Sequence, residues 1–519
     1  MKMTTVNRAA KSALMISVLT LGSKFLGFIR EMLIAAKFGS GMETDTFFVA
    51  LNATSLITTL LTSAISTTFV PVLSEIEEFE GKEGKVKHTS NMINITLVVA
   101  VILIVLAWIS APLIVRLTAK GFDGEQFILA VKLTRIGLPM ILFSGIIGSF
   151  TGFLHSERRH ISSAAIGFPF NAVYIIFLLI FSTKHGITGL MVAAVIATAS
   201  QFLIQVPEAK RAGFKYSPIF DPKDIYVKRV LQLSIPVLIG VAINDLNAIV
   251  NRTMASDLVD GSISALNYGN KLNALVQGVF IVAITTVIFP ILAKEANQGR
   301  IGRMKKVMGE GVNLVLLITI PATIGIIVLA QPIVEVAFER GEFTAADTIM
   351  TKQALIFYSL GLVASSMRLL ITRVYYSLHN TKTPMINGAL SVGFNILLNL
   401  ILIRYMAHAG LAFATSISNT TATLILFYGL KKRIGSLGTL GYVKTGVKSL
   451  AASAPMGVVA YLVYNGLYAF LGNSTIFNLI ALVAAVAAGA LVYLVLCYLF
   501  KIDQVRNVTD KVLQRLKRK

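Results

Sequence analysis

Charged side chains inside long apolar runs are the residues of this sequence most able to do chemistry. The first run carries Lys24, Arg30 and Glu31, and a later run carries Lys271. At the rise of an α-helix, Lys24 lies about 18 Å into its run, which is near the middle of a bilayer. A charge at that depth costs ~2.5–3.5 kcal/mol on insertion scales, so it is a functional candidate.

The sign of these charges indicates the chemistry. Cations outnumber acids among the deep residues, and a cavity lined in this way suits an anionic cargo, most naturally one that bears phosphate. We therefore predict that substrate binding involves a set of basic and amide side chains: Lys24, Arg30, Asn270, Lys271 and Arg373.

Two acids, Glu31 and Asp45, are predicted to be structural or gating charges. Asp45 opens the second apolar run, and Glu31 follows Arg30 directly. An alternative is that both acids only neutralise Arg30 or Lys24 within the helix bundle. For Arg373, which lies near the end of its run, the alternative is that its long side chain reaches the membrane interface.

The spacing of the first three charges predicts their directions on a helix. Lys24 and Glu31 are seven residues apart and share one face. Arg30 points about 100° away from Glu31, because a helix has ~3.6 residues per turn. A bend near Gly22 and Gly27 would be needed to bring all three charges together.

Motifs of soluble enzymes are missing. The sequence has no G-x-x-x-x-G-K-[ST] loop for nucleotide phosphates, and its six scattered histidines and single cysteine, Cys497, form no metal-ligand pattern. Gly39-Ser40-Gly41 lies between two apolar runs and predicts a tight turn rather than a phosphate loop. We expect a protein that is not an enzyme and that uses no cofactor and no metal.

The composition is typical of a membrane protein. Of 519 residues, 55% are hydrophobic and only 14% are charged, and the mean hydropathy is +0.75. A soluble protein carries roughly 25% charged residues. The net charge of +22 could indicate nucleic-acid binding, but the basic residues lie between apolar runs, which indicates membrane topology instead. We expect membrane lipid around the chain and no nucleic acid.

The apolar runs predict an all-α integral membrane protein of about fourteen transmembrane helices, because each run offers the ~20 residues that a crossing needs. The predicted helices are residues 12–38, 45–73, 93–115, 127–153, 162–181, 187–206, 230–255, 262–292, 307–337, 351–376, 384–403, 410–428, 451–471 and 476–500.

Loop charge predicts the orientation. With the N-terminus inside, about thirty of the 47 Lys and Arg fall on inner segments, which include the loops 75–88, 210–229 and 294–306, Arg158-Arg159, the stretch 431–433 and the tail 511–519. An excess of basic residues marks the cytoplasmic side. We therefore expect a multi-pass protein of the bacterial inner membrane with both termini in the cytoplasm.

The chain also repeats itself. AISTTFVPVL at 64–73 matches AITTVIFPIL at 283–292, an offset of 219 residues. Shorter matches follow at an offset of 224: Leu154-His155 with Leu378-His379, and Phe170-Asn171 with Phe394-Asn395. Chance similarity between apolar helices is the alternative, but two matches in one order at nearly one offset favour a duplicated architecture.

The repeat predicts the domain organisation. We expect two pseudo-symmetric six-helix lobes, residues 1–220 and 221–435, followed in 436–519 by two extra helices and a basic cytoplasmic tail. Repeated lobes that rock around a site near the bilayer midplane are a common plan of transporters. The organisation therefore favours transport over catalysis.

Signature runs lie around the charged positions. They are SKFLGFIRE at 23–31, FGSGMETDTFFVA at 38–50, FVPVLSE at 69–75, ALNYGNKL at 265–272, RGEFT at 340–344 and YSLHNTKTP at 376–384. Together they resemble the MurJ/MviN family of lipid II flippases, part of the MOP exporter superfamily. The resemblance extends to about residue 435, and the last two helices match in hydropathy and position.

The resemblance implies a function. Family members carry two lobes around a cationic cavity, and two extra helices form a groove for a polyprenyl tail. They move undecaprenyl-diphosphate-linked peptidoglycan precursor, lipid II, from the inner to the outer leaflet by alternating access. Their functional basic residues correspond to Lys24, Arg30 and Lys271, and their acid at the start of the second helix corresponds to Asp45. We also expect the chain to act as a monomer and to contact the cell-wall synthesis machinery.

Departures from the family pattern leave the head group open. Thr58 and Asn270 stand where some members carry an arginine and an aspartate, and Lys24 and Lys271 are point charges rather than bidentate forks. The alternative cargo is another polyprenyl-linked oligosaccharide, such as a capsule or O-antigen unit. A multidrug exporter of the same superfamily is disfavoured, because cationic drugs call for an excess of buried carboxylates.

Overall fold

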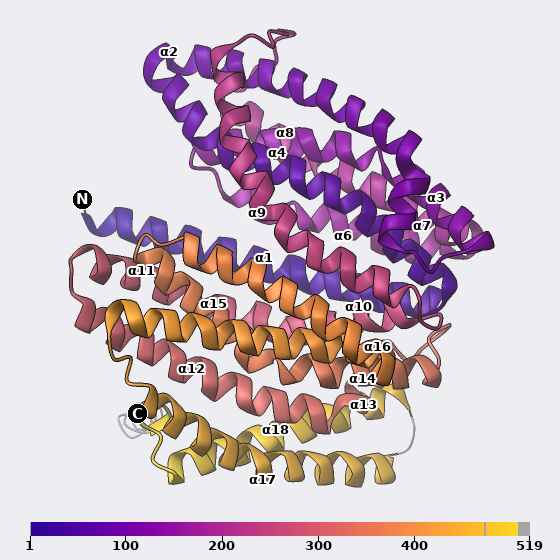
Figure 1. Ribbon diagram of the computed structural model, residues 1–519, viewed down its shortest axis with the longest axis vertical. Helices are drawn as coiled ribbons and strands as arrows, with labels where there is room; N and C mark the ends of the chain where they lie inside the picture. The colour runs from indigo at the N-terminus through magenta and orange to yellow at the C-terminus, as the bar shows by residue number, and fades with distance from the viewer. Residues whose placement is uncertain (1, 472–473, 507–519) are drawn as a thin grey trace. The chain divides into compact units, whose positions relative to one another are not determined.

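The computed structural model describes the backbone of residues 2–471 and 474–506, and their side chains apart from 2–14, 239–240, 243–245 and 471. All regular secondary structure in these described residues is helical, as predicted (Figure 1). The chain divides into two compact units. One comprises residues 1–264 with 341–343, and the other comprises residues 265–340 with 344–519.

The described residues of the first unit form nine complete α-helices and one π-helical turn. They are α1 (Lys2–Phe38), α2 (Met42–Thr118), α3 (Gly124–Gly137), α4 (Met140–Ser156), α5 (Ile161–Ala165), α6 (Gly167–Ile176), η1 (Phe177–Phe181), α7 (Ser182–Ser200), α8 (Phe202–Arg211) and α9 (Ile225–Ala255).

The helix α2 is two antiparallel arms joined at Gly81. Its 77 residues are too many for one crossing, and Gly81 breaks the helix with φ 69°. The prediction of a loop over 75–88 is therefore wrong, because helix continues on both sides of this single residue. Glu and Lys are good helix formers, so the helix persists beyond the apolar residues. A second reversal in this unit lies at Gly186 in α7 (φ 55°).

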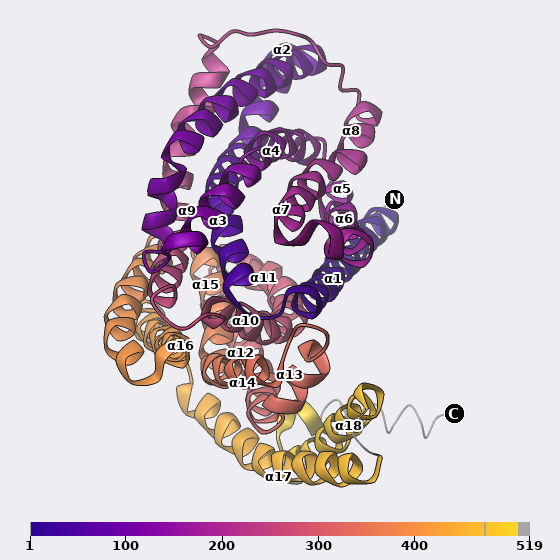
Figure 2. The ribbon, with the colours of Figure 1, turned by 90° about the vertical axis from the view of Figure 1, so that its right-hand side faces the viewer.

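The core of the first unit lies where α4 and α9 pack on α2. Phe69, Ile76, Phe153 and Val230 are buried together there. Figure 2 shows α4 and α9 alongside α2. The predicted helix 127–153 is divided at Leu138–Pro139 into α3 and α4, because proline lacks the N–H that a helix interior needs.

The second unit contains the remaining helices. They are α10 (Ser262–Val276), whose first turn belongs to the first unit, η2 (Gln277–Ile281), α11 (Val282–Asn297), α12 (Ile301–Val328), α13 (Ala330–Phe338), α14 (Ala345–Leu360), α15 (Leu362–Ser377), α16 (Lys382–Ile434), α17 (Thr439–Leu471) and α18 (Thr475–Leu499).

The helix α16 is also a hairpin, with Ala407 at φ 47° inside it. Its arms are tied by Ser391 and Ser418, whose hydroxyls are 3.0 Å apart, and by Asn395, which donates to Thr415 Oγ1 (3.4 Å). The last two helices, α17 and α18, lie side by side in Figures 1 and 2.

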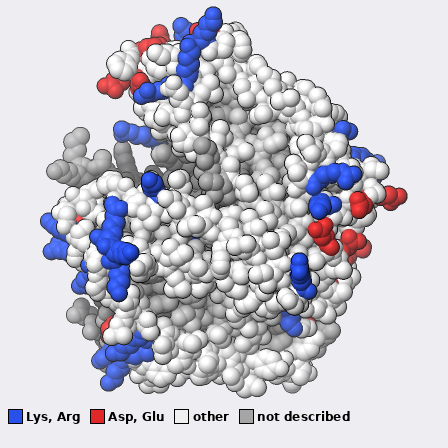
Figure 3. Space-filling view, viewed as in Figure 1, with Lys and Arg blue, Asp and Glu red and all other residues white. Residues whose placement is uncertain are grey.

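The helices have the length and polarity of membrane spans. Within the described residues, eight helical stretches are long and apolar enough to cross a membrane, or nine with the bent pair α14–α15. The helices α1 and α9 lie outside that set, so the number fourteen stays a prediction. Figure 3 shows a face made mostly of residues other than Lys, Arg, Asp and Glu, and these charged residues gather mainly toward the margins of that face. The chain is a multi-pass membrane protein.

Compact units and predicted lobes are different divisions of the chain. The division into compact units places α9 in the first unit, whereas the sequence repeat predicts a boundary between the two lobes at residue 220. The boundaries at 220 and 435 stay predictions, and the predicted basic tail at 511–519 lies outside the described residues.

Candidate functional site

Arg30 on α1 is held in place by contacts with α6. Its guanidinium pairs with Glu31 (Nη2–Oε1 2.8 Å) and donates to Asn171 Oδ1 (3.2 Å). The rings of Phe170 and Tyr174 lie 5.5 and 5.0 Å from the guanidinium carbon, within the range of a cation–π interaction. With its side chain 17% exposed, Arg30 is a fixed and largely enclosed cation.

Close packing of α1 on α6 puts Asn171 beside Arg30. A Cβ at Gly167 would overlap the hydroxyl of Ser23, so the small residue is needed for the helices to approach. Asn171 Nδ2 donates to the carbonyls of Ser23 (3.2 Å) and Gly167 (2.7 Å). Its amide therefore ties the two helices together while its oxygen faces the guanidinium.

Lys24 is an exposed cation within the apolar run of α1. It lies six residues, or about 9 Å, before Arg30 along the helix, and it has no hydrogen-bond or ion-pair partner among the described residues. The helix continues past Gly22 and Gly27 without a break, and Arg30 reaches Glu31 through the length of its side chain. Glu31 therefore neutralises Arg30 and leaves the charge of Lys24 uncompensated.

Asp45 in the first turn of α2 is bonded to the start of α10. Its buried carboxylate accepts from Gly261 N (2.8 Å), from Ser264 N (2.7 Å) and from the Ser264 hydroxyl. The first backbone N–H groups of a helix lack partners within the helix, and an anion there also interacts favourably with the helix dipole. Asp45 on α2 therefore caps the N-terminal end of α10.

Tight backbone contacts surround the start of α2. The expected turn at Gly39-Ser40-Gly41 is present, with Gly39 at φ 65°. Glu342 N donates to Ala36 O at the end of α1 (3.0 Å), and Gly341 has φ 62°. A Cβ on Gly341 would overlap the carbonyl of Ala36, so glycine is required for this contact.

The predicted site residues of the second unit lie on α10 and α15. Asn270 and Lys271 are both exposed on α10, about two helical turns before the π-helical turn η2. Such turns occur frequently at functional sites. On α15, half-buried Arg373 lies with its guanidinium carbon 5.5 Å from the centre of the Phe289 ring.

Sequence reasoning missed the amide partners of the deep arginines. Arg368 on α15 donates to Asn419 Oδ1 (3.0 Å), much as Arg30 donates to Asn171. One signal was available for Asn171, because the repeat pairs it with Asn395. Asn395 is likewise buried, and it accepts a hydrogen bond from Asn399 (3.2 Å).

Comparison with known proteins assigns the family. The family model described as "Lipid II flippase MurJ" matches residues 34–500. A probable lipid II flippase MurJ of Vibrio cholerae serotype O1 is 30% identical over 83% of this chain and 84% of its own length. The lipid II flippase MurJ of Burkholderia cenocepacia is 28% identical over 82% of this chain and 84% of its own.

Solved structures agree with the sequence comparison. A lipid II flippase MurJ in an inward closed conformation superposes with a TM-score of 0.78 at 26% identity, covering 95% of this chain and all of that one. An inward-facing multidrug MATE transporter of the MOP superfamily has a TM-score of 0.65 at 14% identity, over 82% and 99% of the two chains, and so shares the fold alone. The chain belongs to the MurJ family of lipid II flippases.

Proposed function

We propose that this chain moves lipid II from the inner to the outer leaflet of the bacterial inner membrane for cell-wall synthesis. The observation that carries the proposal is the match of residues 34–500 to the flippase family in a chain whose deep charges are mainly basic. Lipid II bears a diphosphate, and phosphate oxygens accept strong hydrogen bonds from Lys and Arg. The protein acts as a transporter by alternating access between the two sides of the membrane.

Basic and amide side chains are the proposed ligands for the phosphates of the cargo. Lys24 is exposed on α1 without a compensating acid, and Arg30, about 9 Å further along the helix, is held by Glu31 and Asn171. In the second unit the proposed ligands are Asn270, Lys271 and Arg373. Fixed cations favour anion binding, because little reorganisation is needed when the cargo arrives.

The polyprenyl tail of the cargo lies along α17. A cavity of about 380 Å³ in the second unit is lined by α12, α15 and α17, including Ile320, Val363, Val443 and Val447. All of its wall is apolar apart from Thr323 and the backbone, which suits a hydrocarbon chain. The extra helices α17 and α18 therefore shelter the lipid tail while the head group crosses.

The orientation follows the distribution of basic residues, with both termini in the cytoplasm. The chain works as a monomer, and the cell-wall synthesis machinery receives the cargo on the outer side. The proposed orientation rests on the charge of the loops, and the proposed hand-over of the cargo rests on the role of the family in cell-wall synthesis.

Depletion of the protein in its own cells tests the function. We expect wall synthesis to stop and lipid II to accumulate, while other polyprenyl-linked sugars stay at their normal levels. Accumulation of a capsule or O-antigen intermediate with normal lipid II would instead identify that oligosaccharide as the cargo.

A further inference from the structure

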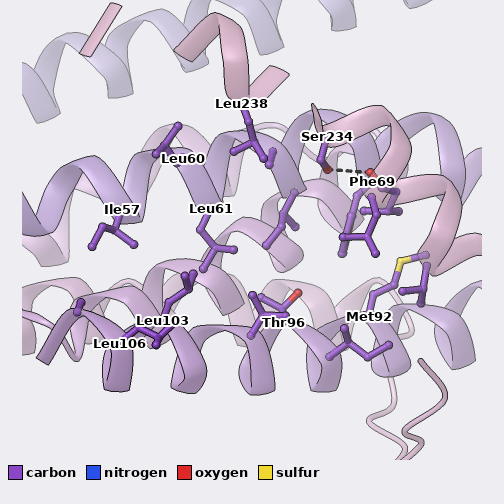
Figure 4. Close-up of a pocket in the computed structure, with 18 of the residues that line it drawn as sticks. Ile57, Leu60, Leu61, Phe69, Met92, Thr96, Leu103, Leu106, Ser234 and Leu238 are labelled. Atoms are coloured by element: carbon purple, nitrogen blue, oxygen red, sulfur yellow. Dashed lines mark hydrogen bonds between the residues drawn. The ribbon is translucent and has the colours of Figure 1, made fainter. Parts of the chain in front are cut away.

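An apolar groove in the first unit lies between the two arms of α2 and α9. Its volume is about 530 Å³, within the ~300–1,000 Å³ of typical ligand sites. Figure 4 shows Ile57 and Leu61 from one arm, Leu103 and Leu106 from the other, and Leu238 from α9 around the same space. All residues that line the groove lie on α2 and α9, and none lies on α1, α10 or α15, which carry the proposed cargo ligands.

The wall of the groove offers almost no hydrogen-bonding capacity. Its serines turn their hydroxyls back to their own helices: Ser110 donates to Leu106 O (2.6 Å) and Ser234 to Val230 O (2.8 Å). Val99 and Leu231 line the groove and are also exposed, so it opens through apolar residues. In a membrane the neighbour at such an opening is hydrocarbon, and an empty groove would lose the dispersion contacts of its walls.

One end of the groove carries positive charge. Lys228 is exposed and lies three residues before Leu231 on the same face of α9, with Arg229 exposed beside it. Asp224, one helical turn before Lys228, contacts His88 (2.6 Å), and so does Glu80 (2.9 Å). A Lys side chain at a helix end extends toward lipid head groups and attracts anionic ones.

From this combination we propose that the groove binds an anionic phospholipid of the surrounding bilayer. One acyl chain fills the space between α2 and α9, and the phosphate lies at Lys228. The size of the groove favours this occupant over the cargo, because a polyprenyl tail is several times longer than an acyl chain. The bound lipid completes the packing of α9 against α2. This inference rests on the chain being a membrane protein and is independent of the cargo.

Native mass spectrometry of the purified full chain tests the proposal with phosphatidylglycerol as the probe. Val99→Trp fills the groove, whereas Val101→Trp adds the same bulk on the neighbouring exposed surface, outside the lining. We expect Val99→Trp to lower retained phosphatidylglycerol about tenfold, equivalent to ~1.4 kcal/mol, and Val101→Trp to retain it as the unchanged protein does. Equal retention by both variants would overturn the proposal.

A second pair and two further lipids complete the test. Leu231→Trp and Leu233→Trp repeat the comparison on α9, where Leu231 lines the groove and Leu233 does not. If one variant fails to fold, the other pair of variants still tests the proposal. Lys228→Gln should abolish the preference for phosphatidylglycerol over zwitterionic phosphatidylcholine. If Val99→Trp instead displaces undecaprenyl phosphate and leaves phosphatidylglycerol bound, the groove holds a prenyl chain and the proposal is wrong.

Discussion

Asp45 and Ser264 are 219 residues apart and in direct contact, with Ser264 N donating to Asp45 Oδ1 at 2.7 Å. The same offset relates the repeated stretches at 64–73 and 283–292. Asp45 and Ser264 are therefore equivalent positions of the predicted repeat, and they meet at the first turn of α2 and the first turn of α10. The contact joins the beginnings of two helices that the repeat pairs with each other.

Replacement of Asp45 should weaken this junction. Hydrogen bonds to a charged group contribute ~1.5–3 kcal/mol each, and Asp45→Ala removes the carboxylate from buried N–H groups. We expect a lower thermal unfolding midpoint in detergent, with Asp45→Asn intermediate because one oxygen is kept. Glu43→Ala, two residues earlier in the same helical turn, is the control. An unchanged midpoint for Asp45→Ala would show that the junction contributes nothing.

Lys85 forms a buried charge cluster in the second arm of α2. The side chain is 1% exposed and pairs with Glu77 (2.7 Å) and with Glu157. Loss of one partner of a fully buried pair costs ~3–5 kcal/mol, and since Glu77 is 39% exposed we expect about 2 kcal/mol for Lys85→Met. The triple variant with Glu77→Gln and Glu157→Gln should recover most of the stability in thermal unfolding. A triple variant less stable than Lys85→Met would contradict this account.

Lipid transport should depend on the forked shape of the Arg30 guanidinium as well as on its charge. Arg30→Lys keeps a cation but loses the simultaneous contacts to Glu31 and Asn171. We expect at least tenfold slower lipid transport in proteoliposomes at matched protein levels, since one charge-assisted bond is worth ~1.5–3 kcal/mol. Arg404→Lys, at an exposed arginine of α16, should transport normally. Normal transport by Arg30→Lys would leave Arg30 with a purely structural role.

Topology is tested with single cysteines, because the native Cys497 is buried. Lys215→Cys, in the basic connection before α9, should resist an impermeant thiol reagent in intact cells. Lys184→Cys, next to the reversal at Gly186, should react. The opposite labelling pattern would invert the predicted orientation.

The sequence predicted what depends on composition and local spacing. The apolar runs located the helices, Gly39-Ser40-Gly41 indicated the turn, and charges such as Arg30 were visible as exceptions within an apolar run. Residue spacing could not reveal that Asn171, 141 positions away, accepts from Arg30, because that contact depends on how α1 packs on α6.

Hydropathy also misjudged helix ends. It predicted a loop over 294–306, yet α11 reaches Asn297 and α12 begins at Ile301. Polar residues such as Lys, Arg and Glu are compatible with helix outside the membrane, so the end of an apolar run is not the end of the helix. The backbone break at Ala407 lies in the predicted gap between the helices 384–403 and 410–428, but no residue type marked its position, since alanine is the strongest helix former.

The central claim is that basic side chains of this transporter bind the diphosphate of lipid II. The most direct test is the translocation of labelled lipid II in proteoliposomes that contain equal amounts of folded Lys271→Glu, Lys271→Arg or unchanged protein. We predict that Lys271→Arg keeps much of the activity, because it keeps the charge, and that Lys271→Glu abolishes transport, because like charges repel. Translocation by Lys271→Glu at the rate of the unchanged protein would contradict the claim.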